Sequence, residues 1–126
     1  MQIPKLFALL GAVNAALAVA LGAFGAHALK ARLAPDLLAI YHTGAQYHCY
    51  HALGLILVGL ACAQWPDAPR LRASGWLMLA GIVLFSGSLY VLSLTGVRGF
   101  GAITPFGGVA FIAAWALFAF SFTRPR

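Results

Sequence analysis

Acidic residues are nearly absent from this sequence. Asp36 and Asp67 are the whole acidic content of its 126 residues, and charged residues of both signs make up only 8% of the chain. In a typical soluble domain about a quarter of the residues are charged, so this composition excludes one. The lack of carboxylates also argues against proton-coupled transport and against many kinds of metal site, because both depend on them.

Cysteine is equally scarce, and the sequence offers no disulfide framework. Cys49 and Cys62 are thirteen positions apart in what we expect to be one helix, which separates them by about 20 Å. A disulfide needs Cα atoms within about 7 Å of each other. Both cysteines are therefore expected to serve as small apolar side chains, with an intermolecular bond as the remaining alternative.

The sequence consists mainly of long runs without charged residues. Hydrophobic residues make up 63% of it, and no Asp, Glu, Lys or Arg occurs in residues 6–26, 37–66, 73–97 or 99–123. The shortest of these runs would form a helix about 31 Å long, which matches the hydrocarbon thickness of a bilayer. Helices satisfy their own backbone polar groups, so runs of this kind predict spanning helices rather than strands.

The predicted fold is therefore all-α: an integral membrane four-helix bundle with short loops. We expect one domain over residues 1–126, with helices near residues 6–26, 41–65, 73–95 and 103–123. The first run could instead be a signal peptide, because residues 26–28 have the small-x-small form of a cleavage site. It is longer than the apolar part of such a peptide and only Lys5 precedes it, so we expect a retained helix.

Small residues dominate that first helix and predict close packing. Gly11 and Ala15, and then Ala18, Gly22 and Ala26, recur every four positions, a spacing that lets a second helix approach closely in lipid. Asn14 lies in the same run. We expect its amide to form a hydrogen bond to another helix.

The cations lie in the loops and predict an orientation. A net charge of +6 would suggest nucleic-acid binding in a soluble chain, but cations that flank membrane spans set topology instead, so no nucleic-acid partner is expected. Five lie on the side of the N-terminus, at Lys5, Arg70, Arg72, Arg124 and Arg126, and three on the other, at Lys30, Arg32 and Arg98. This excess predicts cytoplasmic N- and C-termini.

Residues 27–40 form an amphipathic connection. Leu29, Leu33 and Leu37 repeat every four positions among charged residues that include Lys30 and Arg32. Such leucines would face acyl chains while the cations extend toward headgroups. We therefore predict a segment that lies on the membrane surface after the first helix.

Most of the remaining polar residues gather near one end of the bundle. Residues 41–51 hold three of the four histidines, and Gly44, His48, His51 and Leu55 lie within about 60° on one helix face. The third helix carries Ser86, Ser88, Tyr90 and Ser93 in its second half, and Thr104 is expected to cap the fourth. With four spans these residues share one half of the bilayer, where polar side chains usually face a bundle interior or a wet cavity.

Four motifs resemble one known family. They are Gly22-Ala-Phe-Gly25-Ala-His27-Ala-Leu, Tyr47-His48-x-x-His51-Ala-Leu, Phe85-Ser-Gly-Ser-Leu-Tyr90 and Gly101-x-Ile-Thr104-Pro105-x-Gly107-Gly108. In this order they are similar to the domain of unknown function 423 family, small YgdD-like inner-membrane proteins of the UPF0382 type. The resemblance implies a multi-pass protein of the bacterial inner membrane with four helices, and it implies no activity.

Three kinds of function compete for the polar residues. The first, which we favour, is a non-enzymatic structural or interaction bundle in the lipid bilayer, assembled as a homo-oligomer or within a larger membrane assembly. The second is binding or transport of a small molecule, anion or lipid, with Arg98 at the mouth of a cavity and histidines that titrate near neutral pH. The third is a metal or haem site at His48 and His51, with His27 as a further ligand.

The same residues serve each of these hypotheses, as a hydrogen-bonded seam or as a binding site: His27, Tyr47, His48, His51, Ser88, Tyr90, Arg98 and Thr104. No enzyme is expected, since Asp36 and Asp67 lie in predicted loops and no Gly-x-Ser-x-Gly motif is present. No cofactor or metal is assigned.

Overall fold

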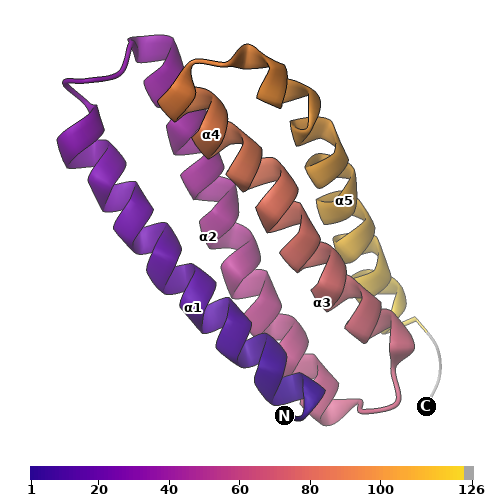
Figure 1. The fold of residues 1–126 in the computed structure, drawn as a ribbon. Coiled ribbons are helices and arrows are strands. Elements are labelled where there is room, and N and C mark those ends of the chain that lie inside the picture. The colour runs from indigo at the N-terminus through magenta and orange to yellow at the C-terminus, as the bar shows by residue number, and fades with distance from the viewer. Residues whose placement is uncertain (124–126) are drawn as a thin grey trace.

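The structure, a computed structural model, describes residues 1–123 and is helical throughout its regular elements (Figure 1). The first helical rod is α1 (Ile3–Phe24) with the π-helical turn η1 (Gly25–Leu29), and the second is α2 (Pro35–Gln64). The third consists of α3 (Pro69–Gly81), the π-helical turn η2 (Ile82–Ser86) and α4 (Gly87–Thr95). The 3-10 turn η3 (Arg98–Ala102) leads into α5 (Thr104–Phe120). The predicted all-α bundle of four helices is confirmed.

Proline and glycine mark where the rods begin and end. The α-helices α1, α2, α3 and α5 each have a proline in the first turn, at Pro4, Pro35, Pro69 and Pro105. Proline has no amide hydrogen to lose there, and its fixed φ suits a helix start. The third rod ends at Gly96, whose φ of 72° is left-handed, a conformation that favours glycine.

Three of the rods are long and apolar enough to cross a membrane: Ile3–Leu29, Pro69–Thr95 and Arg98–Phe120. α2 has the length but not the average hydropathy, because its first half carries the histidine and tyrosine cluster. Figure 1 shows α2 lying beside α1 and the third rod along its whole length. Its buried histidines, His48 and His51, are therefore held against apolar helices.

The surface-lying segment predicted for residues 27–40 was wrong in its extent. His27 and Leu29 continue α1 through η1, and residues from Pro35 onward belong to α2, so the connection shortens to residues 30–34. Proline at the start of α2 fixes where that helix begins. Leu29 is buried against the bundle rather than turned to acyl chains.

α2 occupies the middle of the bundle. It contacts α1 on one side and the third rod on the other, and α5 packs against the third rod. A side chain at Gly11 would meet the Ala52 carbonyl at 2.8 Å, and one at Gly59 would meet the Pro4 carbonyl at 2.8 Å. These two glycines let α1 and α2 approach closely, which confirms the predicted packing at Gly11, whereas Gly22 has no neighbour within 4 Å.

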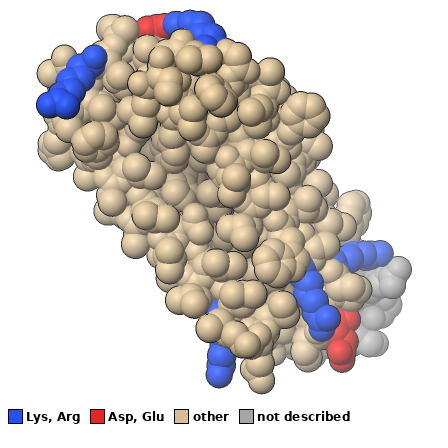
Figure 2. All heavy atoms as spheres, in the orientation of Figure 1, with Lys and Arg blue, Asp and Glu red and all other residues tan. Residues whose placement is uncertain are grey.

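The bundle has an apolar half and a polar half. The core gathers Phe7, Leu55, Val58, Leu71, Met78, Ile82, Phe111 and Ala114, nearer the end that holds the N-terminus. Lysine and arginine side chains lie at the two ends and leave the waist uncharged (Figure 2). The described cations divide between the ends as predicted; Arg124 and Arg126 lie outside the described residues.

Candidate functional site

His48 joins three helices. It is 4% exposed and projects from α2 between α1 and α4. Its Nε2 lies 2.9 Å from Asn14 Oδ1, and its Nδ1 lies 2.9 Å from the Tyr90 hydroxyl. Asn14 Nδ2 donates to the Leu10 carbonyl at 2.8 Å, which identifies Oδ1 as the atom that accepts from His48. The interhelical hydrogen bond predicted for Asn14 is confirmed.

His51 makes the corresponding connection to α5. It is 4% exposed, its Nδ1 lies 2.7 Å from the Tyr47 carbonyl, and its Nε2 accepts from Trp115 Nε1 at 3.1 Å. The imidazole also stacks on Phe111, with 3.4 Å between ring centroids, and on Tyr47. We call His48, His51, Asn14, Tyr47, Tyr90 and Trp115 the polar seam.

The hydrogen-bond partners place a proton on a different ring nitrogen in each imidazole. Asn14 Oδ1 can only accept, so His48 carries a proton on Nε2, and its Nδ1 is hydrogen-bonded to the Tyr90 hydroxyl. The Tyr47 carbonyl can only accept, so His51 carries its proton on Nδ1 and receives Trp115 on Nε2. All four ring nitrogens of the two histidines are thus hydrogen-bonded to groups within the bundle.

Ser88 and Thr104 form a separate contact above the seam. Their hydroxyls lie 2.6 Å apart and join α4 to the start of α5, and Ser88 also donates to the Phe85 carbonyl at 2.9 Å. The helix cap predicted for Thr104 was wrong: no side chain caps α5. A buried partner on α4 takes the threonine hydroxyl instead.

The remaining two predicted site residues lie outside the seam. Arg98 is paired with Asp36 across the rim of the bundle, with both side chains more than half exposed. The hydrogen bond from Arg98 holds the pKa of the Asp36 carboxyl below its usual value. Arg98 is therefore not a free cation at the mouth of a cavity. His27 is exposed on η1 and does not join the other histidines.

The sequence analysis did not predict the interhelical hydrogen bonds of Tyr41 and Trp115. Tyr41 is fully buried and donates its hydroxyl to the Leu21 carbonyl on α1 at 2.5 Å. Trp115 lies in the fourth apolar run, where an indole resembles any other lipid-facing aromatic side chain. Only the packing of α5 against α2 shows that its N–H points inward.

Two buried serines test how much a buried hydroxyl group contributes to stability with and without a hydrogen-bond partner. Ser74 donates to the Ala114 carbonyl at 2.7 Å, whereas Ser86 Oγ is buried without a hydrogen-bond partner in the described part of the chain. Ser74→Ala should destabilise the bundle by about 1 kcal/mol and Ser86→Ala should stabilise it by about as much. Equilibrium unfolding in mixed detergent and SDS micelles measures both. Destabilisation of equal size would mean that Ser86 has an unrecognised partner.

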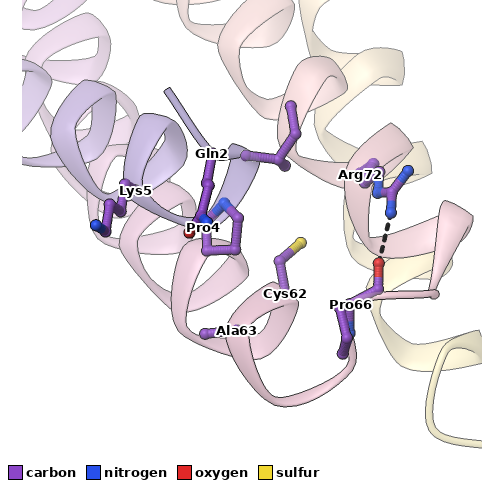
Figure 3. A pocket seen from close by; sticks show the side chains of 8 residues that line it. Gln2, Pro4, Lys5, Cys62, Ala63, Pro66 and Arg72 are labelled. Atoms are coloured by element: carbon purple, nitrogen blue, oxygen red, sulfur yellow. Dashed lines mark hydrogen bonds between the residues drawn. The ribbon is translucent and has the colours of Figure 1, made fainter.

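A hollow opens at the opposite end of the bundle, where sequence reasoning had predicted no site. It has a volume of about 560 Å³ and lies between the start of α1, the end of α2 and the first turn of α3 (Figure 3). Its lining consists of Gln2, Ile3, Pro4, Lys5, Cys62, Ala63, Pro66 and Arg72. The sequence could not predict this hollow, because its lining residues come from three separate segments and do not form a cluster in the sequence.

Comparison with known proteins identifies relatives along nearly the whole chain. Residues 21–108 match the family described as "Protein of unknown function (DUF423)". The UPF0382 membrane protein YwdK of Bacillus subtilis is 55% identical over 113 residues, which cover 90% of this chain and 92% of the relative. The UPF0382 membrane protein SERP0230 of Staphylococcus epidermidis is 49% identical over 111 residues, covering 88% and 89%.

No solved structure matches the chain. The matched family region contains every residue of the predicted site and of the polar seam except Asn14 and Trp115, and the resemblance drawn from the four sequence motifs is confirmed. The chain therefore belongs to the DUF423 family and is a membrane protein with several membrane-spanning helices.

Proposed function

We propose that this chain is a non-enzymatic interaction bundle of the bacterial inner membrane, which assembles with a second copy of itself through α2. The observation that carries the proposal is a pair of polar side chains, Gln46 and Tyr50, exposed on α2 deep within the bundle's span. The polar seam is then a structural device that holds the helices in register. The excess of cations that the sequence has on the N-terminal side supports a cytoplasmic location for both termini.

The depth of Gln46 follows from the seam. His48 is hydrogen-bonded to Asn14, which lies near the middle of the apolar span Ile3–Leu29. Gln46 is two residues from His48, about 3 Å along the helix axis, so it lies near mid-membrane. Its Nε2 donates to the Tyr50 hydroxyl at 2.5 Å. In hydrocarbon, the amide oxygen of Gln46 needs a donor from a further helix.

The exposed face of α2 has the spacing of a helix-packing seam. Thr43, Gln46, Tyr50, Leu53, Leu57 and Leu60 are all exposed and alternate in steps of three and four residues. This heptad spacing is typical of helices that pack at about 20°. From Thr43 to Leu60 the face is about 26 Å long, nearly the hydrocarbon thickness of a bilayer. We call these six residues the α2 face.

The chemistry of the α2 face suits a second copy. Two copies inserted in the same direction and related by a twofold axis along the membrane normal place identical residues at equal depth. Gln46 then meets Gln46, and a primary amide carries both a donor and an acceptor, so the pair satisfies itself. The leucines of both copies pack below it.

Cross-linking tests this assembly. We expect Leu57→Cys, in a chain with Cys49→Ala and Cys62→Ala, to give a disulfide-linked dimer on oxidation in membranes, because residue 57 lies on the α2 face. Ile112→Cys on α5, where Ile112 is 73% exposed, is the matched control and should remain monomeric. Adding Gln46→Leu should weaken dimerisation about three-fold, since an interhelical hydrogen bond in lipid contributes about 0.6 kcal/mol.

Two results would reject the proposed dimer. Equal cross-linking at residues 57 and 112 would indicate random collision, and a cross-link from residue 57 to a different protein would replace the second copy as the partner. The alternative of anion or small-molecule binding in the polar half has less support, because Arg98 is paired with Asp36 and every ring nitrogen of His48 and His51 is hydrogen-bonded within the bundle.

A further inference from the structure

The hollow at the N-terminal end of the bundle combines an apolar floor with a cationic wall. Pro4 on α1 lies opposite Cys62 and Ala63 on α2, and Arg72 lies on the α3 side (Figure 3). Ile3 is a further apolar lining residue. Cys62 is 3% exposed, so part of the apolar floor belongs to the buried core. Neither acid of the sequence is among the lining residues. A mostly apolar hollow with a cation at one wall suits a ligand that is apolar with an anionic head.

Arg72 is held in place at the wall. Its Nη2 donates to the Pro66 carbonyl at 2.5 Å, within the loop that ends α2, and Figure 3 shows this bond across the edge of the hollow. A guanidinium has five N–H donors, so this bond positions the group and uses only one of them. Guanidinium groups bind phosphate by paired hydrogen bonds, which is the recognition that a fixed arginine offers best.

The position of the hollow favours a lipid over a soluble ligand. It lies between the start of α1 and the loop from α2 to α3, and Lys5, Arg70 and Arg72 belong to these segments. The apolar spans Ile3–Leu29 and Pro69–Thr95 begin at this end, so we expect the hollow to lie near the membrane surface. Asp67 follows Pro66 in the same loop, and the three cations outnumber this single acid. Basic pockets between membrane helices at this level bind anionic headgroups, and the acyl chain of a lipid can occupy an apolar floor.

We propose that this pocket binds the phosphate of an anionic phospholipid, with Arg72 on the phosphate and the first carbons of an acyl chain against Ile3, Pro4 and Cys62. The site shares no residue with the α2 face or with the polar seam. The lipid site can therefore be tested independently of the proposed dimer.

Lipid retention by the full-length chain tests the proposal. Phosphatidylglycerol is titrated into the protein in a non-ionic detergent, and the bound lipid is counted by native mass spectrometry. Arg72→Ala should weaken retention about ten-fold, since it removes a charge-assisted contact. Arg70→Ala is the matched control. Arg70 lies two residues away, donates to the Phe120 carbonyl at 3.2 Å and does not line the hollow, so its loss should change retention less than two-fold.

A second variant guards against a folding defect in Arg72→Ala. Ala63→Phe leaves every cation in place and fills the hollow from its α2 wall, and it should reduce retention by a similar factor. Equal weakening by Arg70→Ala and Arg72→Ala would show attraction to net charge alone and overturn the site. Retention that Ala63→Phe leaves unchanged would also overturn it. Competition by millimolar inorganic phosphate would show that the ligand is a soluble phosphate and overturn the lipid assignment.

Discussion

Gly107→Ala should destabilise the bundle by about 3 kcal/mol, the upper end of the range for overpacking a buried contact. Gly107 is where α5 crosses the π-helical turn η2, and a Cβ there would collide with the backbone nitrogen of Phe85 and lie 2.8 Å from its Cα. Backbone atoms cannot turn aside as a flexible side chain can. α5 would have to move away from the third rod and lose packing along the interface.

The neighbouring glycine provides the control. A Cβ at Gly108 would lie 3.9 Å from the Phe85 ring, which is ordinary van der Waals contact. Gly108→Ala should therefore be neutral or stabilising, by up to about 1 kcal/mol from the helix propensity of alanine. Both variants are measured by equilibrium unfolding in mixed detergent and SDS micelles. If Gly107→Ala unfolded no earlier than Gly108→Ala, α5 would not approach η2 as closely as described.

The sequence predicted the helices well because the bilayer constrains them strongly. Four apolar runs separated by charge can form few structures in lipid, and four prolines mark where the helices begin. The prediction failed at residues 27–40, where leucines spaced four apart suit a surface-lying helix as well as the ends of two spanning helices. Leu29 faces the bundle, and only the approach of α2 to α1 reveals that.

The sequence predicted several residues of the polar seam but not the hydrogen bonds between them. The count of spans was enough to predict that His48, His51 and Tyr90 come near one another, and the structure links His48 directly to Tyr90. The hydrogen-bond partner of each histidine nitrogen depends on how the helices are rotated about their axes. The sequence does not give that rotation, so it could not predict the partners of Trp115 or Tyr41. The pocket around Arg72 was not predicted at all, because its walls come from three segments whose proximity is a product of folding.

His48→Leu should be the most damaging change in the polar seam, with a loss of about 3 kcal/mol in the free energy of unfolding. The leucine fills much of the imidazole volume but leaves Asn14 Oδ1 and the Tyr90 hydroxyl without the partners they have now. An unsatisfied buried polar group costs about 1–3 kcal/mol, and lipid offers neither group a substitute. His42→Leu, an exposed histidine on the same helix, should change stability by less than about 0.5 kcal/mol.

Adding Tyr90→Phe to His48→Leu separates a structural role from a binding role. In the double variant the stranded hydroxyl is gone, so stability should recover by about 1 kcal/mol relative to His48→Leu alone, whereas Tyr90→Phe in the native background should be destabilising. The effect of Tyr90→Phe on stability is expected to change sign between the two backgrounds only if His48 and Tyr90 are hydrogen-bonded to each other. A His48→Leu protein that unfolds like the native one, and loses a small molecule that the native protein retains, would instead make His48 a ligand-binding residue.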